Sequence, residues 1–237
     1  TLAGNFSIAL KQQSGQEVAL VDLNPELGDV AVALGLTPQF SVSDALRNPE
    51  RLDQEFLSTL LVEHKSGVRV LAAPDQYQPG PLAQNGSLGK LLYVLRHKFP
   101  YVVVDAGPGL GPAAEAVFEM ADRVYLVTEA DIASLRNAER LLAYMRRPAA
   151  AEHRVEVVLN RWDHRKMEVP EDRIAKALGA PVRWKVPNDY ASVQRSLNAG
   201  TPLALGNSAV SRAVHQMARE ACGKPAAAEK KGKWDLF

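Results

Sequence analysis

The run from Tyr101 to Gly109 constrains the fold of this chain most strongly. It reads Tyr-Val-Val-Val-Asp-Ala-Gly-Pro-Gly, so three consecutive valines end in Asp105 and a glycine and proline turn follows at once. This run predicts a fully buried parallel strand that delivers a carboxylate to the carboxyl edge of a sheet, where open α/β sheets bind ligands. In a nucleotide hydrolase, such an aspartate would hold the water shell of Mg²⁺, and Gly109 would let the backbone approach a terminal phosphate. The alternative is a core strand that ends in an ordinary turn-forming aspartate.

A second apolar strand, residues 17–22, also ends in an aspartate, Asp22. Strand and helix patterns alternate along the rest of the chain, which predicts an α/β fold: a mostly parallel, doubly wound sheet with helices on both faces. We expect helices over residues 1–13, 27–34, 41–63, 88–95, 113–120, 133–147, 170–178, 190–198 and 208–221, and strands over residues 17–22, 67–73, 101–105, 123–128, 154–159 and 182–185.

Composition narrows the function classes. With 237 residues, 46% of them hydrophobic, the chain can bury one sizeable core. Its net charge of +1 gives no overall basic field, so capture of nucleic acid by the field of the whole protein is not expected, and a local basic patch is the alternative. The lone Cys222 excludes an internal disulfide framework and suits a reducing cytoplasm. No apolar run approaches the ~18 residues of a transmembrane helix, and the histidines lack metal-ligand spacing.

A nucleotide hydrolase of this class needs a glycine-rich loop that ends in Lys-Ser/Thr and cradles the phosphates. The nearest candidate, residues 86–90, fails because Leu91 follows Lys90 and Gln84 replaces the first glycine. A helix that starts at Thr1 is what would follow a Gly-Lys-Thr sequence, so we expect the first strand and the phosphate loop to be missing from this chain. The alternative is that Thr1 is an ordinary helix N-cap.

The chain resembles the MinD/ParA family of deviant P-loop ATPases, and within it the CpaE/TadZ-like proteins of Flp (Tad) pilus assembly. The resemblance runs from Thr1 to about Ala221 and implies a P-loop NTPase-type sheet over residues 1–222. The Leu-Gly-Asp-Val-Ala and Ser-Leu-Arg-Asn-Ala strings are similar to the pilus branch more than to MinD or ParA proper. The stretches that carry the resemblance are residues 21–35, 70–74, 134–138, 159–161, 186–190 and 198–202.

The resemblance assigns the phosphate side of the site to four residues. It implies that Thr1 lies near the α-phosphate and that Gly109 is the switch glycine near the γ-phosphate. Asp105 matches the Walker B carboxylate, a Mg²⁺ position. Asp22 matches the acidic residue that helps to organise Mg²⁺ and the attacking water, so it is both a metal and a catalytic candidate.

On the adenine side, Asn160 and Arg161 match the family's Asn-Arg pair, while Pro187 and Asn188 match the loop that packs against the base. Asn160 and Pro187 can also be read as residues that simply end a strand and turn the chain. Asn24 departs from the family, because MinD has a second aspartate there that is implicated in hydrolysis. An amide orients water but cannot accept a proton as a carboxylate does, so we expect slow hydrolysis.

These assignments imply a cytoplasmic ATPase, with ATP and Mg²⁺ as cofactors, whose ATP-dependent homodimerisation and Mg²⁺-assisted hydrolysis position or assemble a Flp/Tad pilus. Its partners would be pilus assembly or polar-localisation proteins, and it would lie in the cytoplasm or peripherally at the inner membrane or cell pole. Without the loop, residues 1–237 are expected to bind ATP poorly and to be inactive. The alternatives are a non-hydrolysing scaffold of the same fold, a MinD-like protein of the division site, and a ParA-like partition protein.

The composition changes after Cys222. Residues 223–237 are rich in lysine and alanine and contain one proline, which predicts a disordered basic tail. Its end combines lysines with Trp234, Leu236 and Phe237, the ingredients of a weak contact with a membrane surface or a partner. A solvated tail with no such contact is the alternative.

Overall fold

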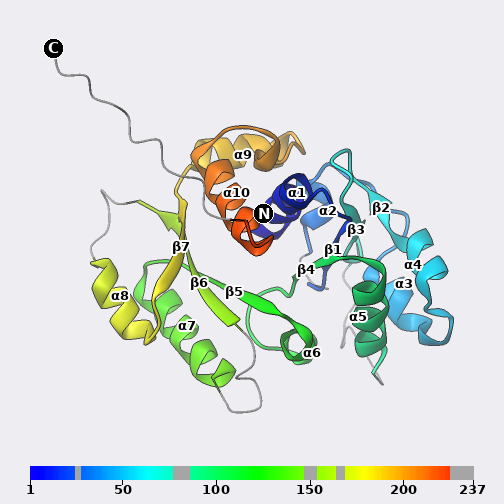
Figure 1. The fold of residues 1–237 in the computed structure, drawn as a ribbon, viewed down its shortest axis with the longest axis horizontal. Coiled ribbons are helices and arrows are strands. Elements are labelled where there is room, and N and C mark those ends of the chain that lie inside the picture. The colour runs from blue at the N-terminus through cyan, green and yellow to red at the C-terminus, as the bar shows by residue number, and fades with distance from the viewer. Residues whose placement is uncertain (25–27, 77–85, 147–153, 164–168, 225–237) are drawn as a thin grey trace.

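The computed structural model describes residues 1–24, 28–76, 86–146, 154–163 and 169–224 (Figure 1). The helices are α1 (Leu2–Ser14), α2 (Val30–Ala33), α3 (Val42–Arg47), α4 (Gln54–Leu60), α5 (Ser87–Lys98), α6 (Pro112–Met120), α7 (Ile132–Met145), α8 (Glu171–Leu178), α9 (Tyr190–Asn198) and α10 (Ala209–Ala221), with short 3-10 helices η1 (Pro49–Arg51) and η3 (Leu203–Leu205). The strands are β1 (Val18–Asp22), β2 (Val62–Glu63), β3 (Arg69–Leu71), β4 (Tyr101–Asp105), β5 (Arg123–Thr128), β6 (Arg154–Trp162) and β7 (Val182–Pro187).

The described strands form two sheets, with the orders β2-β3-β1-β4 and β5-β6-β7 (Figure 1). Every pairing is parallel except that of β2 with β3. β1 lies against β4 in a register that places Asp22 opposite Asp105. The two strand-ending aspartates therefore meet at one edge of the first sheet, as parallel strands require.

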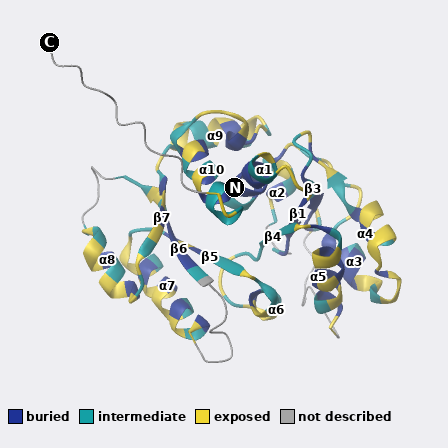
Figure 2. Ribbon diagram, viewed as in Figure 1, coloured by how far each residue is buried: buried dark blue, intermediate teal, exposed yellow. Residues whose placement is uncertain are grey.

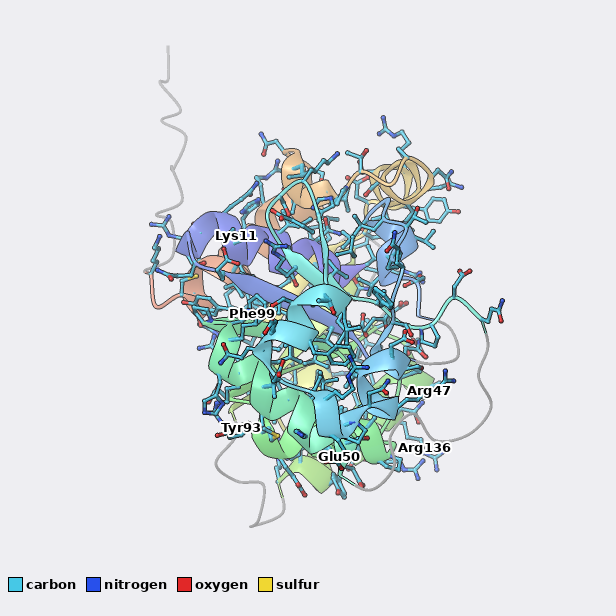
Figure 3. The ribbon with its side chains drawn as sticks, turned by 90° about the vertical axis from the view of Figure 1, so that its right-hand side faces the viewer. Lys11, Arg47, Glu50, Tyr93, Phe99 and Arg136 are labelled. Carbon is cyan, nitrogen blue, oxygen red and sulfur yellow. The ribbon has the colours of Figure 1, made fainter. Side chains whose placement is uncertain are left out.

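Helices cover both faces of this α/β arrangement, as the sequence predicts. α1 and α10 lie on one face, where a single apolar cluster joins β1 residues such as Leu20 to Val158 of β6 and Val186 of β7. On the other face, α3 to α6 cover the first sheet, and α7 and α8 cover the second. Figure 3 shows α3, α4 and α5 from outside, with the exposed Tyr93 on the outer side of α5.

Several helices that follow a strand begin at a side-chain cap. Asp131 accepts a hydrogen bond from the Ser134 amide at the start of α7, and Asp189 accepts one from the Ser192 amide at the start of α9. These caps satisfy amide groups that the first helical turn leaves unpaired. The capping residues therefore fix where the chain leaves the carboxyl edge of the second sheet.

The structure corrects two expectations. The helix expected over residues 41–63 is divided into α3, η1, α4 and strand β2. Pro49 has no amide hydrogen to continue α3, and Asp53 caps a new helix by accepting from the Phe56 amide. The strand at residues 101–105 is parallel, but it is not fully buried, because all five of its residues retain intermediate exposure.

One further expectation, the basic tail over residues 223–237, falls largely outside the described residues, which end at residue 224. Within the described residues, no helix is both long enough and apolar enough to cross a bilayer.

Candidate functional site

Asp22 and Asp105 form the centre of the first half of the site. Each ends an apolar strand, and parallel pairing of β1 with β4 places the two residues side by side. Asp22 is buried, with 1% of its surface exposed. Its Oδ1 accepts a hydrogen bond from the Asn24 amide at 3.0 Å, and its Oδ2 accepts one from the Val30 amide at 3.2 Å. Asp22 therefore also connects the end of β1 to the start of α2, a role that the sequence did not predict.

Burial raises the pKa of Asp22 to about 6 from an ordinary value of 3.8, and the charges of Asp105 and Asp29 add to that rise. The amide hydrogen bonds from Asn24 and Val30 oppose it. A carboxyl group with a raised pKa is costly to ionise in the folded protein. A cation beside Asp22 and Asp105 would offset this cost.

We expect the stability of the native chain to fall, relative to an Asp22→Asn variant, as pH rises from 4 to 7. Between the two pKa values the folded state binds the extra proton, so deprotonation favours the unfolded state. The shift corresponds to a loss of about 3 kcal/mol, at ~1.4 kcal/mol per pKa unit. Urea unfolding of both proteins at several pH values measures the difference, and a difference that does not vary with pH would contradict the raised pKa.

Close backbone packing surrounds the carboxylates. Gly107 has a φ of 70°, its amide donates to Asp105 Oδ1 at 3.2 Å, and a Cβ there would lie 3.4 Å from Asn24 Cβ. A Cβ on Gly28 would lie 2.1 Å from Ala73 Cβ and 2.8 Å from Asp22 Oδ2. The sequence reasoning missed both glycines, although Gly107 lies within the run from Tyr101 to Gly109 and Gly28 lies within the resembling stretch.

Gly109 and Thr1 lie at the margins of this half. Gly109 has a φ of 84°, and a Cβ there would meet nothing within 4 Å, so its backbone is open to approach. Thr1 precedes α1 and makes no side-chain cap, although its carbonyl oxygen accepts from Asn5 Nδ2 at 2.9 Å. With Val30 and Ser196 it lines a small cavity. Thr1 therefore lies on the Asp22 side of the site.

The second half lies at the carboxyl ends of β6 and β7. The pairing of these strands is irregular between Leu159 and Trp162, so Asn160 and Arg161 occupy a bulge. Arg161 has a φ of 50°, the only positive φ of a non-glycine residue in the described chain. Its guanidinium lies 3.3 Å from Glu129 Oε1, just beyond the end of β5, and this partner was not predicted.

The expected base-packing loop lies beside this bulge. Pro187 is opposite Trp162 in the register of β6 and β7, and the Asn188 amide donates to the Trp162 carbonyl oxygen at 2.9 Å. The structure therefore brings Asn160, Arg161, Pro187 and Asn188 together. They lie on the second sheet, whereas Asp22, Asn24 and Asp105 lie on the first.

The donor set of the first half fits Mg²⁺. This ion is usually bound through one or two carboxylates, together with water and substrate phosphates. Asp22 and Asp105 supply two such carboxylates, and the described residues contain no cluster of three or more metal-ligating side chains. The remaining oxygen ligands would therefore have to come from water or phosphate.

No protein-family model matches the chain. The septum site-determining protein MinD of Thermotoga maritima is 23% identical over 232 residues, 94% of this chain and 83% of that protein. The crystal structure of a ParA family ATPase from Chlorobium tepidum aligns with a TM-score of 0.83 and 26% identity, over 92% of this chain and 90% of that one. MinD from Pyrococcus horikoshii, complexed with Mg-ADP, aligns with a TM-score of 0.77 and 18% identity, over 93% and 88% of the two chains. The chain therefore has the MinD/ParA ATPase fold.

Proposed function

We propose that this chain is the ATPase domain of a MinD/ParA-type protein that positions or assembles a Flp/Tad pilus, as CpaE/TadZ-like proteins do. The observation that carries the ATPase part is the pairing of Asp22 with Asp105 at the carboxyl edge of a parallel sheet, beside glycine turns with positive φ. The pilus part is supported by the Leu-Gly-Asp-Val-Ala and Ser-Leu-Arg-Asn-Ala strings.

In this proposal, Asp105 and Asp22 hold Mg²⁺, which supplies charge neutralisation at the phosphates when it is bound. Asn24, whose side chain lies against Gly107, orients the attacking water. The open backbone at Gly109 approaches the terminal phosphate. These residues position and polarise the reacting groups, and the amide of Asn24 cannot accept a proton as the aspartate of MinD does, so we expect slow turnover.

The base would lie over the second half of the site. Asn160 presents an amide that both donates and accepts, and Pro187 offers an apolar edge. The strand bulge places Arg161 at this edge, where its guanidinium pairs with Glu129. Residues 1–237 contain no Gly-Lys-Ser/Thr phosphate loop, so the proposal requires this loop to come from outside them.

The decisive experiment compares the protein isolated from its source cells with an Asp105→Asn variant expressed there at the same level. We expect Mg²⁺-dependent phosphate release to fall at least tenfold in the variant and Flp pili to be lost, because an amide neither carries the charge nor binds Mg²⁺ as well. An Asp122→Asn variant is the control, because Asp122 forms only an exposed ion pair with Arg96. Residues 1–237 alone should bind Mg-ATP weakly or not at all in calorimetry.

The same experiment separates the alternatives. Pili that depend on the protein, without phosphate release above background, would indicate the non-hydrolysing scaffold that Asn24 favours. Intact pili with misplaced septa would indicate a MinD-like role at the division site, which the similarity to T. maritima MinD supports. A partition role has less support, because His215 contacts the Ala204 carbonyl oxygen and Arg212 donates to the Asn207 carbonyl oxygen within the protein.

A further inference from the structure

Helix α5 begins at a turn that leaves its first amide groups open. Gly86 precedes the helix with a φ of 74°, and no side chain of the described residues caps this end. The Lys90 amide donates to the Gly86 carbonyl oxygen, which closes the first turn. The amides of residues 87–89 have no acceptor inside the helix. The first turn also contains no acidic side chain, so the positive end of the helix dipole is not neutralised from within the helix.

Ser87, the first residue of α5, has a buried hydroxyl group without a partner. Only 3% of its surface is exposed, and its Oγ has no hydrogen-bond partner among the described residues. Side chains of a helix lean toward its N-terminus, so this hydroxyl lies on the side of the open amides. A buried hydroxyl without a partner is costly, because it has given up its hydrogen bonds to water. The hydroxyl and the amides therefore lack the same kind of partner, an oxygen atom that accepts hydrogen bonds.

Two glycines leave room for that partner. A Cβ on Gly86 or on Gly89 would meet no atom within 4 Å, and Gly86 is exposed. The inner face of α5 is buried in the core and its outer face is exposed (Figure 2). Lys90 lies one turn beyond Ser87 and is held beside η1 by a hydrogen bond from its Nζ to the Pro49 carbonyl oxygen. Its ammonium group brings a positive charge to the same end of the helix.

We propose that residues 86–90 bind one phosphate group, either free inorganic phosphate or the phosphate of a small monoester. The amides of residues 87–89 and the Ser87 hydroxyl donate to the phosphate oxygens, and Lys90 adds charge. A tetrahedral oxyanion suits this site better than a planar carboxylate does, because the donors come from several successive backbone positions and from a side chain. The charge of the oxyanion is stabilised by the end of the helix.

This turn is not the phosphate loop that an ATPase of this class needs. Its Gly-Ser-Leu-Gly-Lys sequence is followed by Leu91, where that loop has a serine or threonine. The turn lies instead at the start of a helix that leads into β4, because α5 ends at Lys98 and β4 begins at Tyr101. Binding here requires neither Mg²⁺ nor a nucleotide, so the proposal does not depend on the proposed function.

Titration of residues 1–237 with inorganic phosphate, followed through amide chemical shifts in NMR, tests the site. We expect the amides of residues 87–89 to shift and to saturate, whereas chloride at the same ionic strength leaves them unchanged. Ser87→Ala should weaken binding about tenfold, because a hydrogen bond to a charged group is lost. Ser58→Ala is the matched control, because its hydroxyl donates to the Gln54 carbonyl oxygen within α4, and it should bind as the native protein does.

A parallel titration with glycerol 3-phosphate distinguishes the two sources of the phosphate group. Tighter binding of glycerol 3-phosphate would indicate a monoester, and tighter binding of inorganic phosphate would indicate the free ion. Either result supports the site.

Two variants of Gly89 separate binding from folding. Both Gly89→Asp and Gly89→Asn place their side chains in open space, and an aspartate near a helix N-terminus is stabilising. The aspartate carboxylate nevertheless repels phosphate and competes for the amides, so Gly89→Asp should bind about tenfold more weakly than Gly89→Asn. Without phosphate, Ser87→Ala should unfold at the same or a higher urea concentration than the native protein, because it removes an unpartnered polar group.

Three results would each overturn the proposal. These are no shift at residues 87–89 with either phosphate compound, as expected if water occupies the turn, equal binding by the two Gly89 variants, and a Ser87→Ala variant that binds phosphate as tightly as the native protein. Saturable binding at residues 87–89, in a protein whose native form releases no phosphate from ATP, would support this site and refute the ATPase.

Discussion

Replacement of Gly200 by alanine should lower the free energy of unfolding by about 3 kcal/mol. Gly200 has a φ of 55°, and a Cβ there would lie 2.7 Å from the Cα of Gly35. The obstruction is backbone and cannot rotate away, so α2 and the end of α9 would have to separate. The cost therefore combines left-handed strain of about 1–2 kcal/mol with overpacking of about 1–3 kcal/mol.

A Gly15→Ala variant is the matched control. Gly15 has a φ of 70°, but a Cβ there would meet nothing within 4 Å, so only the backbone strain of about 1–2 kcal/mol applies. Urea unfolding of both variants measures the difference. Equal losses would show that the contact between Gly35 and Gly200 carries no stability of its own. The contact matters for the site because the Val30 amide, at the start of α2, donates to Asp22.

Replacement of Glu156 by alanine should cost about 3–5 kcal/mol of stability, the usual cost of breaking a buried charge pair. The Glu156 side chain is buried, its Oε2 accepts from Trp184 Nε1 at 2.6 Å, and its Oε1 lies 3.4 Å from Arg123 Nη1. In the variant, the indole N–H of Trp184 and the largely buried guanidinium of Arg123 lose the Glu156 carboxylate as a partner. The strands β5, β6 and β7 lose a polar connection beneath α10.

The control for Glu156 is Glu63→Ala. Glu63 pairs with Arg69 at 3.0 Å, but the side chains are 54% and 40% exposed, so the expected loss is below about 1 kcal/mol. Thermal and urea unfolding should show a large loss for the first variant alone. Similar small losses in both would mean that neighbouring groups or water replace the carboxylate of Glu156.

Most secondary structure followed from local pattern. The apolar runs ending in Asp22 and Asp105 predicted two strands, and both are present and parallel. The sequence prediction missed the division of residues 41–63, because their helical spacing of apolar residues continues through Pro49, which ends one helix, and Asp53, which caps the next. The sequence also could not indicate β2, a two-residue strand that exists only through its antiparallel pairing with β3.

The resemblance predicted which residues belong to the candidate site, but it did not predict the contacts between them. The resemblance indicated Asp22, Asn24, Asp105, Asn160, Arg161, Pro187 and Asn188, and the structure gathers them in two groups at the carboxyl edges of the sheets. Their catalytic, metal-binding and base-binding roles stay predictions. The hydrogen bonds that engage both oxygens of Asp22, and the pairing of Arg161 with Glu129, join residues that are separated in the sequence.

The sequence by itself determined most of the segments that become strands and helices, and which strands end in a carboxylate, because these depend on the period of apolar residues and on caps within a few positions. Only the tertiary structure decided that Asp22 lies opposite Asp105, that Gly35 meets Gly200, and that the described strands form two sheets. Such features depend on which segments become neighbours. The burial of whole faces of helices and sheets decides which segments become neighbours, and no single stretch of sequence reveals that burial.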